Sequence, residues 1–399
     1  MLDVTIIGAG LAGACAANVL ARAGYSVAVV DTQAVHPAEF RAEKLGAPHM
    51  SLFEQLGLGE IARSAVTPIE NIRVYRFGKL ISQENRREYG FAYCGLVNAM
   101  RRAVPDTVAQ YISRVESVET GPDIQIVTLR DGRMLKSRLL VISTGLGDAV
   151  KRKAGIARTD VKKAHSLSLA FNFARPANAF PFQSLNYFGH KRRDLVSYLT
   201  LFPLENAMRA NFFVYHEAKD EWTKRFRAAP QEKLLEMMPE IAGICDDFRL
   251  NGPVEVRQID LTTTPDASRD GVVLLGDAFC STCPAPGVGI QRVLRDVTQL
   301  CTVHLPQWLK TPGMDTEKIA QFYSDPEKLA TDSRAMELSI YSRAMVMDDG
   351  AVWTARRLRN DTVRRAILLQ AQAVRWFGRM TGNAGLRPLQ QPSRDIMGA

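Results

Sequence analysis

The sequence predicts an α/β protein in which a domain built on a parallel sheet is interrupted by a mixed-sheet α+β domain and followed by C-terminal helices. Three observations lead to this prediction. A strand–helix–strand pattern with glycines in its first turn opens the chain. Two blocks in the middle, residues 69–93 and 165–216, alternate apolar and polar residues as half-buried strands do. From residue 316 to about residue 380 the apolar spacing is mostly that of helices.

Length and composition indicate an ordinary globular protein. The chain has 399 residues, of which 46% are hydrophobic and 23% are charged, which is enough for two domains with a large core. Nothing at the N-terminus resembles a signal peptide, and no stretch reaches the roughly 18 uninterrupted apolar residues that a membrane-spanning helix needs. The six cysteines are too scattered for a disulfide framework. We therefore expect a cytoplasmic protein.

The first turn of the chain carries a dinucleotide-binding motif. Residues 4–7 form a short β-branched run typical of a buried parallel strand, and residues 11–23 have helical periodicity. Gly8, Gly10 and Gly13 form a GxGxxG motif across this turn. Gly8 permits the tight turn, Gly10 lets the backbone approach a pyrophosphate, and Gly13 lets the helix pack close to the strand. The N-terminus of the helix offers free N–H groups to the phosphates.

An acidic residue supports the same interpretation. A second strand, residues 25–30, ends in Asp31. It lies about 20 residues beyond the glycines, where a carboxylate can accept hydrogen bonds from both ribose hydroxyls. A carboxylate there disfavours a 2′-phosphate, so FAD or NAD is favoured over NADP. Because two strands, a helix and an acid surround the glycines, an adenine dinucleotide is a stronger interpretation than a glycine-rich turn without a ligand.

Two further segments resemble one family of flavoenzymes. Arg41 follows the second strand, and the downstream segment GVVLLGDAFCSTCPAPGVGI contains Gly276-Asp277 and a P-x-x-G-x-G motif that opens a helix. Together with the N-terminal motif, these segments resemble the FAD-dependent aromatic hydroxylases, the single-component flavoprotein monooxygenases whose prototype is p-hydroxybenzoate hydroxylase. The resemblance is firm over residues 1–60 and 271–296 and only topological between them.

This resemblance implies a Rossmann-like FAD-binding domain of the GR2 type, with Arg41 on the flavin side, Asp277 on the ribityl chain and a helix N-terminus facing the isoalloxazine. Asp296 matches the acid that commonly follows on that helix. A helix N-terminus at the flavin would stabilise its anionic reduced form. No residue is assigned a catalytic role. The candidate FAD-binding residues are Gly8, Gly10, Leu11, Ala12, Gly13, Asp31, Thr32, Arg41, Gly276, Asp277, Pro284, Gly287, Val288, Gly289 and Ile290.

Cys280 and Cys283 lie inside the second motif, and Cys280 stands where many relatives carry a histidine. Three interpretations are open: two small residues tolerated in a tight loop, a redox dithiol beside the flavin, and a metal site. Zinc would need two more ligands, and neither a second CxxC nor a histidine pair lies nearby. The first interpretation is favoured, and we expect no metal.

One motif departs from the family pattern. Relatives carry an acid–glycine pair, linked to FAD and nicotinamide contacts, after the strand that precedes the substrate domain. Here residues 144–147 read Thr-Gly-Leu-Gly, with Asp148 displaced and Arg152 in register. Tyr93 takes the place of a frequent arginine in another motif. We expect FAD binding to survive, with NADH, NADPH or a separate flavin reductase as the electron donor.

The segments define a domain plan. The substrate domain is rich in aromatic residues, most of which we expect in its core and the remainder around an apolar pocket. The FAD-binding domain is predicted at residues 1–68, 94–164 and 250–310, the substrate domain at residues 69–93 and 165–249, and a C-terminal helical region at residues 311–399.

The net charge of +9 is unevenly spread. Residues 355–380 contain seven arginines and one acid, Asp361. The first interpretation of this helix is a docked helix with solvated arginines, and the second is a peripheral membrane contact. No nucleic-acid-binding motif is present, and we expect no such partner. Apolar residues lie at mostly helical spacing among the arginines: Leu358, Ile367, Leu368, Val374 and Phe377.

Together these features predict an FAD-dependent monooxygenase. The resemblance implies that reduced flavin reacts with O2 to give a C4a-hydroperoxide, which hydroxylates or epoxidises an apolar small molecule that we expect to be cyclic. Two alternatives stay open. One is an FAD-dependent reductase of an alkene or prenyl substrate, and the other is a flavin-binding protein without turnover.

Overall fold

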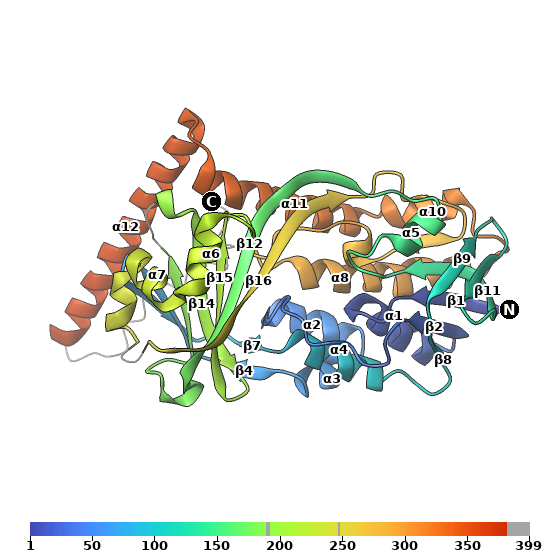
Figure 1. Cartoon of the computed structure of the whole chain (residues 1–399), viewed down its shortest axis with the longest axis horizontal. Coiled ribbons are helices and arrows are strands. Elements are labelled where there is room, and N and C mark those ends of the chain that lie inside the picture. The colour runs from blue at the N-terminus through green and yellow to red at the C-terminus, as the bar shows by residue number, and fades with distance from the viewer. Residues whose placement is uncertain (189–191, 246–247, 381–399) are drawn as a thin grey trace. The chain divides into compact units, whose positions relative to one another are not determined.

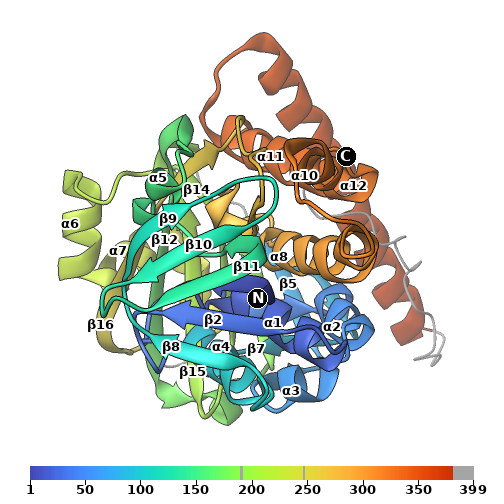
Figure 2. The ribbon, with the colours of Figure 1, turned by 90° about the vertical axis from the view of Figure 1, so that its right-hand side faces the viewer.

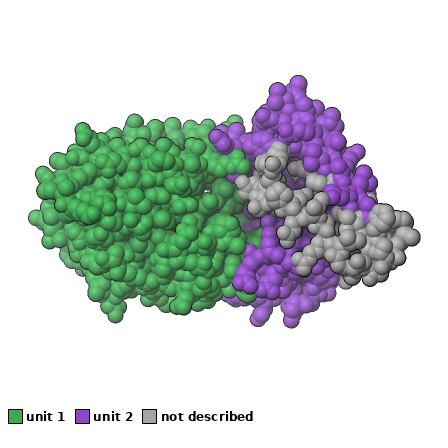
Figure 3. Space-filling model, turned by 180° about the vertical axis from the view of Figure 1, so that it is seen from behind, with its two compact units in different colours: residues 1–68, 88–165, 259–336 green, residues 69–87, 166–258, 337–399 purple. Residues whose placement is uncertain are grey.

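A computed structural model of the chain describes residues 1–188, 192–245 and 248–380 (Figure 1). The chain forms two compact units (Figure 3). Unit 1 comprises residues 1–68, 88–165 and 259–336, and unit 2 comprises residues 69–87, 166–258 and 337–399. Residues 311–399, predicted as one helical region, therefore divide between the two units. The functions that the sequence assigns to each part stay predictions.

Unit 1 is built on a seven-stranded sheet with the order β8-β2-β1-β11-β10-β9, in which β17 also pairs with β11 (Figure 2). The strands β17, β11, β1, β2 and β8 are parallel, and β10 and β9 are antiparallel additions. Val4, Ile6 and Val141 are fully buried, as expected where helices cover a parallel sheet. The bounds are β1 (Leu2–Ile7), β2 (Val27–Asp31), β8 (Ala109–Ile112), β9 (Val115–Glu119), β10 (Gln125–Leu129), β11 (Met134–Ile142) and β17 (Val272–Leu274).

The carboxyl ends of the parallel strands bring the predicted motifs to one edge of this sheet. β1 ends before Gly8, β2 ends at Asp31, β11 ends before Ser143, and β17 leads into Gly276. Ligands of open α/β sheets bind at this edge. The register of the strands therefore collects motifs that lie more than 200 residues apart in the sequence.

Helices and a small three-stranded sheet complete unit 1. α1 packs against α4 and α8, and the many small residues of α1 allow close contact with the sheet. The helices are α1 (Leu11–Arg22), α2 (Ala47–Gln55), α3 (Gly59–Arg63), α4 (Tyr93–Arg102), α5 (Ala149–Lys153), α8 (Gly289–Thr298), a π-helix (Gln299–His304), α9 (Leu305–Trp308), α10 (Thr316–Tyr323) and the first part of α11 (Pro326–Met347). The small sheet has the order β3 (Lys44–Gly46), β7 (Glu88–Gly90), β4 (Thr67–Ile69).

Unit 2 contains a second seven-stranded sheet with the order β16-β12-β15-β14-β13-β5-β6. The apolar cluster of this unit includes Phe171, Phe212 and Phe226, in line with the expectation that most aromatic residues here belong to the core. The elements are β5 (Ile72–Arg76), β6 (Lys79–Glu84), β12 (Thr159–Pro176), β13 (Ser184–Phe188), β14 (Val196–Leu204), β15 (Ala207–Val214), β16 (Leu250–Thr263), α6 (Glu221–Ala228), α7 (Pro230–Met237) and α12 (Ala351–Met380).

The predicted fold class is confirmed. A mainly parallel α/β sheet is interrupted in sequence by a mixed sheet, and helices follow at the C-terminal end (Figure 1). Within residues 1–188, 192–245 and 248–380, none of the helices combines the length and the hydrophobicity that crossing a bilayer requires.

Candidate cofactor-binding site

The glycine turn has the local geometry that a bound pyrophosphate needs. Gly8 has a φ of +98°, a conformation that favours glycine. A Cβ on Gly13 would lie 1.9 Å from the carbonyl oxygen of Gly8, so only glycine lets α1 start this close to the turn. A Cβ on Gly10 would instead meet no described atom within 4 Å. Among the described side chains none caps α1. The turn therefore leaves both space and N–H donors for an anion.

Three predicted residues have buried side chains and could offer only backbone groups to a cofactor. Leu11, Ala12 and Ile290 are buried and pack into the core of unit 1. Their N–H groups, at the starts of α1 and α8, are the parts that a cofactor could contact.

Asp31 is held in place by an arginine that sequence reasoning missed. The Asp31 carboxylate accepts hydrogen bonds from the backbone N–H of Ala9 (2.6 Å) and of Gln33 (2.9 Å), and from Arg101 Nη2 (3.1 Å). Arg101 also donates to the carbonyl oxygens of Ala9 and Gln33. A carboxylate has about four acceptor positions, so Asp31 keeps capacity for a ribose hydroxyl.

A shallow cavity of about 500 Å³ lies beside Asp31, at the carboxyl ends of β2 and β8. The predicted residue Thr32 lines it, and its polar and open character suits the adenosine half of a dinucleotide. The other lining residues are Gln33, Ile112, Ser113, Arg114, Arg130 and Asp131.

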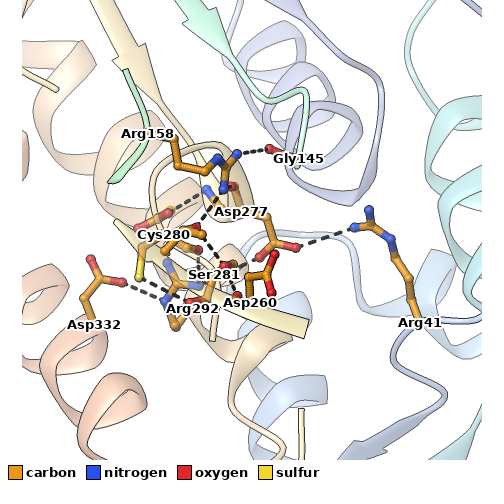
Figure 4. A network of polar contacts seen from close by, with 12 residues as sticks. Arg41, Gly145, Arg158, Asp260, Asp277, Cys280, Ser281, Arg292 and Asp332 are labelled. Atoms are coloured by element: carbon orange, nitrogen blue, oxygen red, sulfur yellow. Dashed lines mark hydrogen bonds and ion pairs between the residues drawn. The ribbon is translucent and has the colours of Figure 1, made fainter. Parts of the chain in front are cut away.

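The Gly-Asp motif forms a tight turn that places its carboxylate between two arginines (Figure 4). Gly276 has a φ of +59° and starts a 3₁₀ turn, Gly276–Ala278. Asp277 Oδ2 lies 3.6 Å from Arg41 Nη1, and Asp277 Oδ1 lies 4.0 Å from Arg292 Nη1. The structure thus brings the predicted pair Arg41 and Asp277 together. It adds Arg292, which the sequence did not single out.

The loop that precedes α8 is tied to the N-terminal part of unit 1. Gly287 has a φ of +74°, and its N–H donates to the carbonyl oxygen of Pro284 (2.9 Å). Its own carbonyl oxygen accepts from His49 Nε2 (3.1 Å), whose Nδ1 accepts from the N–H of Gly46 (3.1 Å). Burial lowers the pKa of His49, which favours the neutral ring that this pattern requires. Val288 precedes α8, which begins at Gly289.

A buried network of charged side chains forms hydrogen bonds with the Gly-Asp segment at both of its ends. The N–H of Gly276 donates to Asp296 (2.8 Å), and Lys328 Nζ donates to both Asp296 (2.8 Å) and Asp332 (2.9 Å). Arg292 then donates to Asp332 (2.8 Å) and to the carbonyl oxygen of Cys280 (2.9 Å). The predicted acid Asp296 thus anchors the turn from behind, together with partners from α11.

Cys280 and Cys283 are buried, and neither forms a disulfide. Burial raises the pKa of Cys280, although Arg292 nearby opposes this shift, so the reactive thiolate is disfavoured. No group of three or more His, Cys, Asp or Glu side chains with the arrangement of a metal site occurs in the part of the chain that the structure describes.

The departures from the family pattern have structural counterparts. Tyr93 is buried, and the guanidinium of Arg41 lies 5.4 Å from the centre of its ring. In α5 the buried cation is Lys151, whereas Arg152, the residue in register with the family motif, is exposed.

The residues of unit 1 fit an FAD molecule, because an open glycine turn, an oriented carboxylate and a second carboxylate between arginines all lie at the carboxyl edge of its sheet.

Known proteins resemble this chain in sequence and fold. A family model described as an FAD binding domain matches residues 1–310. The chain is 22% identical over 331 residues to the FAD-dependent monooxygenase atnJ of Arthrinium sp, covering 76% of each protein. It is 28% identical over 163 residues to menaquinone reductase of Mycobacterium tuberculosis, covering 38% of this chain and 40% of that one. The structure of p-nitrophenol 4-monooxygenase PnpA from Pseudomonas putida DLL-E4 matches with a TM-score of 0.73 at 16% identity, over 97% of this chain and 99% of that one, which shows the shared fold.

Proposed function

The chain belongs to the FAD-binding-domain family and is an FAD-dependent monooxygenase of the aromatic hydroxylase type, and we propose that it hydroxylates or epoxidises an apolar, cyclic small molecule. One atom of O2 would enter the substrate, and the other would leave as water. NADH, NADPH or a separate flavin reductase would supply the two electrons as a hydride equivalent, and solvent would supply the second proton. Bound FAD would supply the oxygen chemistry. The flavin C4a-hydroperoxide stays a prediction.

The convergence of the motifs in unit 1 carries this proposal. The chain's own residues would bind the pyrophosphate at the turn around Gly10, hold the ribose at Asp31 and orient the ribityl chain at Asp277. Arg41 and Arg292 lie near the two oxygens of the Asp277 carboxylate and would fix its direction. The sequence had already indicated these residues, except for Arg292. Their roles toward FAD are proposals.

The sheet of unit 2 carries a short row of buried polar side chains on the face opposite its apolar core. Leu199 and Leu201 of β14 point into the apolar core, so Thr200 between them points to the other face. Thr200 pairs with Asn186 on β13 and with Asn211 on β15. All three polar residues are buried, and together they form a row that could recognise hydroxyl, carbonyl or amino substituents.

The same face of this sheet carries a stack of aromatic rings. Tyr198 stacks on Phe188 with 5.2 Å between ring centres, and its ring lies 4.8 Å from that of Phe213. The guanidinium of Arg76 lies 5.1 Å from the centre of the Phe188 ring. Such a surface suits a planar, mainly apolar ring.

Isotope labelling tests the proposed reaction. Purified enzyme is supplied with 18O2, FAD, an electron donor and a panel of ring-containing substrates. We expect a product that carries one 18O atom and forms in proportion to the O2 consumed. Consumption of O2 that yields only hydrogen peroxide, with every donor and substrate, would contradict oxygen insertion.

A second candidate is an FAD-dependent reductase of an alkene or prenyl substrate. The partial sequence similarity to menaquinone reductase favours it. A reductase would consume the alkene without O2 and release an unlabelled saturated product. The labelling experiment therefore separates the two functions.

The helix α12 carries a third feature, for which the second of the two interpretations of its arginine-rich sequence, a peripheral membrane contact, can be tested. Leu358 and Leu369 are 69% and 66% exposed, and Arg356 and Arg365 are exposed on the same helix. Apolar and cationic side chains on one helix suit an anionic bilayer surface. We expect the protein to sediment with vesicles that contain phosphatidylserine but not with pure phosphatidylcholine vesicles; equal recovery with both would contradict this contact. Four apolar residues that the sequence analysis names on this helix have side chains outside the described residues: Ile367, Leu368, Val374 and Phe377.

The cytoplasmic location stays a prediction.

A further inference from the structure

The segment that replaces the family's acid–glycine pair forms a closed turn of its own. The Thr144 hydroxyl donates to the carbonyl oxygen of Gly147 (2.9 Å), and the N–H of Gly147 donates to the carbonyl oxygen of Thr144 (3.1 Å). Gly145 has a φ of +60°. The turn lacks a carboxylate of its own, and the nearest acid in the sequence is Asp148, at the start of α5.

Asp148 acts as the common partner of two cations. Its Oδ1 accepts hydrogen bonds from Lys151 Nζ (2.8 Å) and from Arg158 Nε (2.9 Å). Lys151 is fully buried and the Arg158 side chain is 9% exposed, whereas that of Asp148 is 38% exposed. Burial would raise the pKa of the Asp148 carboxyl, but the two cations hold it below its usual value. The carboxylate therefore stays ionised at neutral pH.

The same two cations reach the Gly-Asp turn. Lys151 Nζ donates to the carbonyl oxygen of Ala278 (3.1 Å), and Arg158 Nη1 donates to that of Asp277 (3.1 Å). Arg158 also donates to Thr262 Oγ1 (2.8 Å) and, through Nη2, to the carbonyl oxygen of Gly145 (3.1 Å). Figure 4 shows Arg158 between Gly145 and the Asp277 segment.

We propose that Arg158 and Lys151, held together by Asp148, are positioning residues that fix the Asp277 turn for FAD. The 3₁₀ turn Gly276–Ala278 is too short to satisfy its own carbonyl groups, and hydrogen bonds from charged donors are the stronger kind. This inference rests on the proposed FAD site. It explains how the chain dispenses with the acid of the family motif, because a displaced carboxylate and two cations hold the neighbouring segments instead.

The electrostatics of this arrangement favour the same role. A lysine amine is costly to bury unless it is paired and hydrogen-bonded. Lys151 has both a carboxylate and a carbonyl partner, and both partners belong to segments that frame the candidate site. Arg158 donates hydrogen bonds to three segments of unit 1: the turn at Gly145, the end of β16 at Thr262 and the turn at Asp277.

Two substitutions and a conservative variant test this role. FAD affinity is measured by fluorescence titration of the apoprotein, and stability by urea denaturation of the same apoprotein. We expect Arg158→Gln and Lys151→Met to weaken FAD binding at least tenfold and to alter the absorption spectrum of the bound flavin. Arg158→Lys keeps the pairing with Asp148 but loses the fork of donors, so we expect it to recover part of the affinity.

Lys153→Gln is the matched control, because Lys153 lies on the same helix and is exposed. It should bind FAD as the parent protein does. If the Arg158 and Lys151 variants lose stability yet bind FAD with unchanged affinity and spectrum, the cluster is structural only and the inference is overturned. Failure of the parent protein to bind FAD would instead overturn the proposed function.

Discussion

Replacing Gly10 with alanine is expected to weaken FAD binding at least tenfold while leaving the apoprotein folded. Gly10 has a φ of −66°, which alanine adopts freely, and an added Cβ meets no described atom within 4 Å. The loss of a glycine at the N-cap should cost about 1 kcal/mol or less. The added methyl group would, however, occupy the space through which the pyrophosphate approaches the backbone.

Gly13→Ala provides the contrast, because its methyl group would overlap the carbonyl oxygen of Gly8. We expect this change to destabilise the apoprotein by about 3 kcal/mol or more. Gly95→Ala is the control, since Gly95 lies in α4 with only an ordinary contact and alanine favours a helix. Denaturation and FAD titration of the three variants separate a cofactor role from a folding role. Unchanged FAD affinity in Gly10→Ala would contradict the site.

Replacing Asp332 with asparagine is expected to cost about 3–5 kcal/mol of folding free energy, because it leaves buried cations without their partner. Asp332 accepts hydrogen bonds from Arg292 and Lys328, which are 0% and 1% exposed. Arg292 in turn faces Asp277. We therefore expect FAD affinity to fall together with stability. Urea denaturation and FAD titration measure the two effects.

The lowered pKa of Asp332 also predicts how the stability of the fold depends on pH. Burial would raise the pKa of its carboxyl, but Arg292 and Lys328 hold the pKa below the ordinary value. A group whose pKa is lower in the folded state stabilises the fold above its unfolded pKa, which is about 3.9. The stability that Asp332 contributes should be lost as the pH falls below about 4. Asp332→Asn should therefore lose less stability over the same pH range.

A second variant distinguishes the buried pairing from a general effect on α11. Lys328→Met in the Asp332→Asn background also leaves the buried Asp296 without its cation, so we expect it to lower stability further. Glu327→Gln on the same helix changes an exposed carboxylate near Arg295 and should cost less than about 1 kcal/mol. A similar loss in Glu327→Gln and Asp332→Asn would argue against the buried network.

The sequence predicts well what depends on neighbouring residues. The glycine turn, the helix α1 and the acid Asp31 form a local pattern in which each part has a physical reason, and the structure places them as this pattern requires. The Gly-Asp turn and the start of α8 are also local. The motif predicts where this helix starts but not where it ends: α8 ends at Thr298 and a π-helix follows, since helix ends are weakly encoded.

The supporting charges were missed because they come from distant segments. Arg101, Lys328 and Asp332 look like ordinary surface residues of amphipathic helices, and nothing near them in the sequence indicates burial. One signal was available. Arg292 stands four residues before the inward-facing Asp296, so the two share a face of α8. An arginine on that face must be buried and paired.

The most direct test of the account is a titration of the purified apoprotein with FAD, followed by the visible absorption spectrum. We expect saturable binding of one FAD per chain, with a flavin spectrum shifted from that of free FAD, and much weaker binding by Gly10→Ala. A folded protein that leaves the spectrum and the fluorescence of FAD unchanged at saturating concentrations would contradict the central claim.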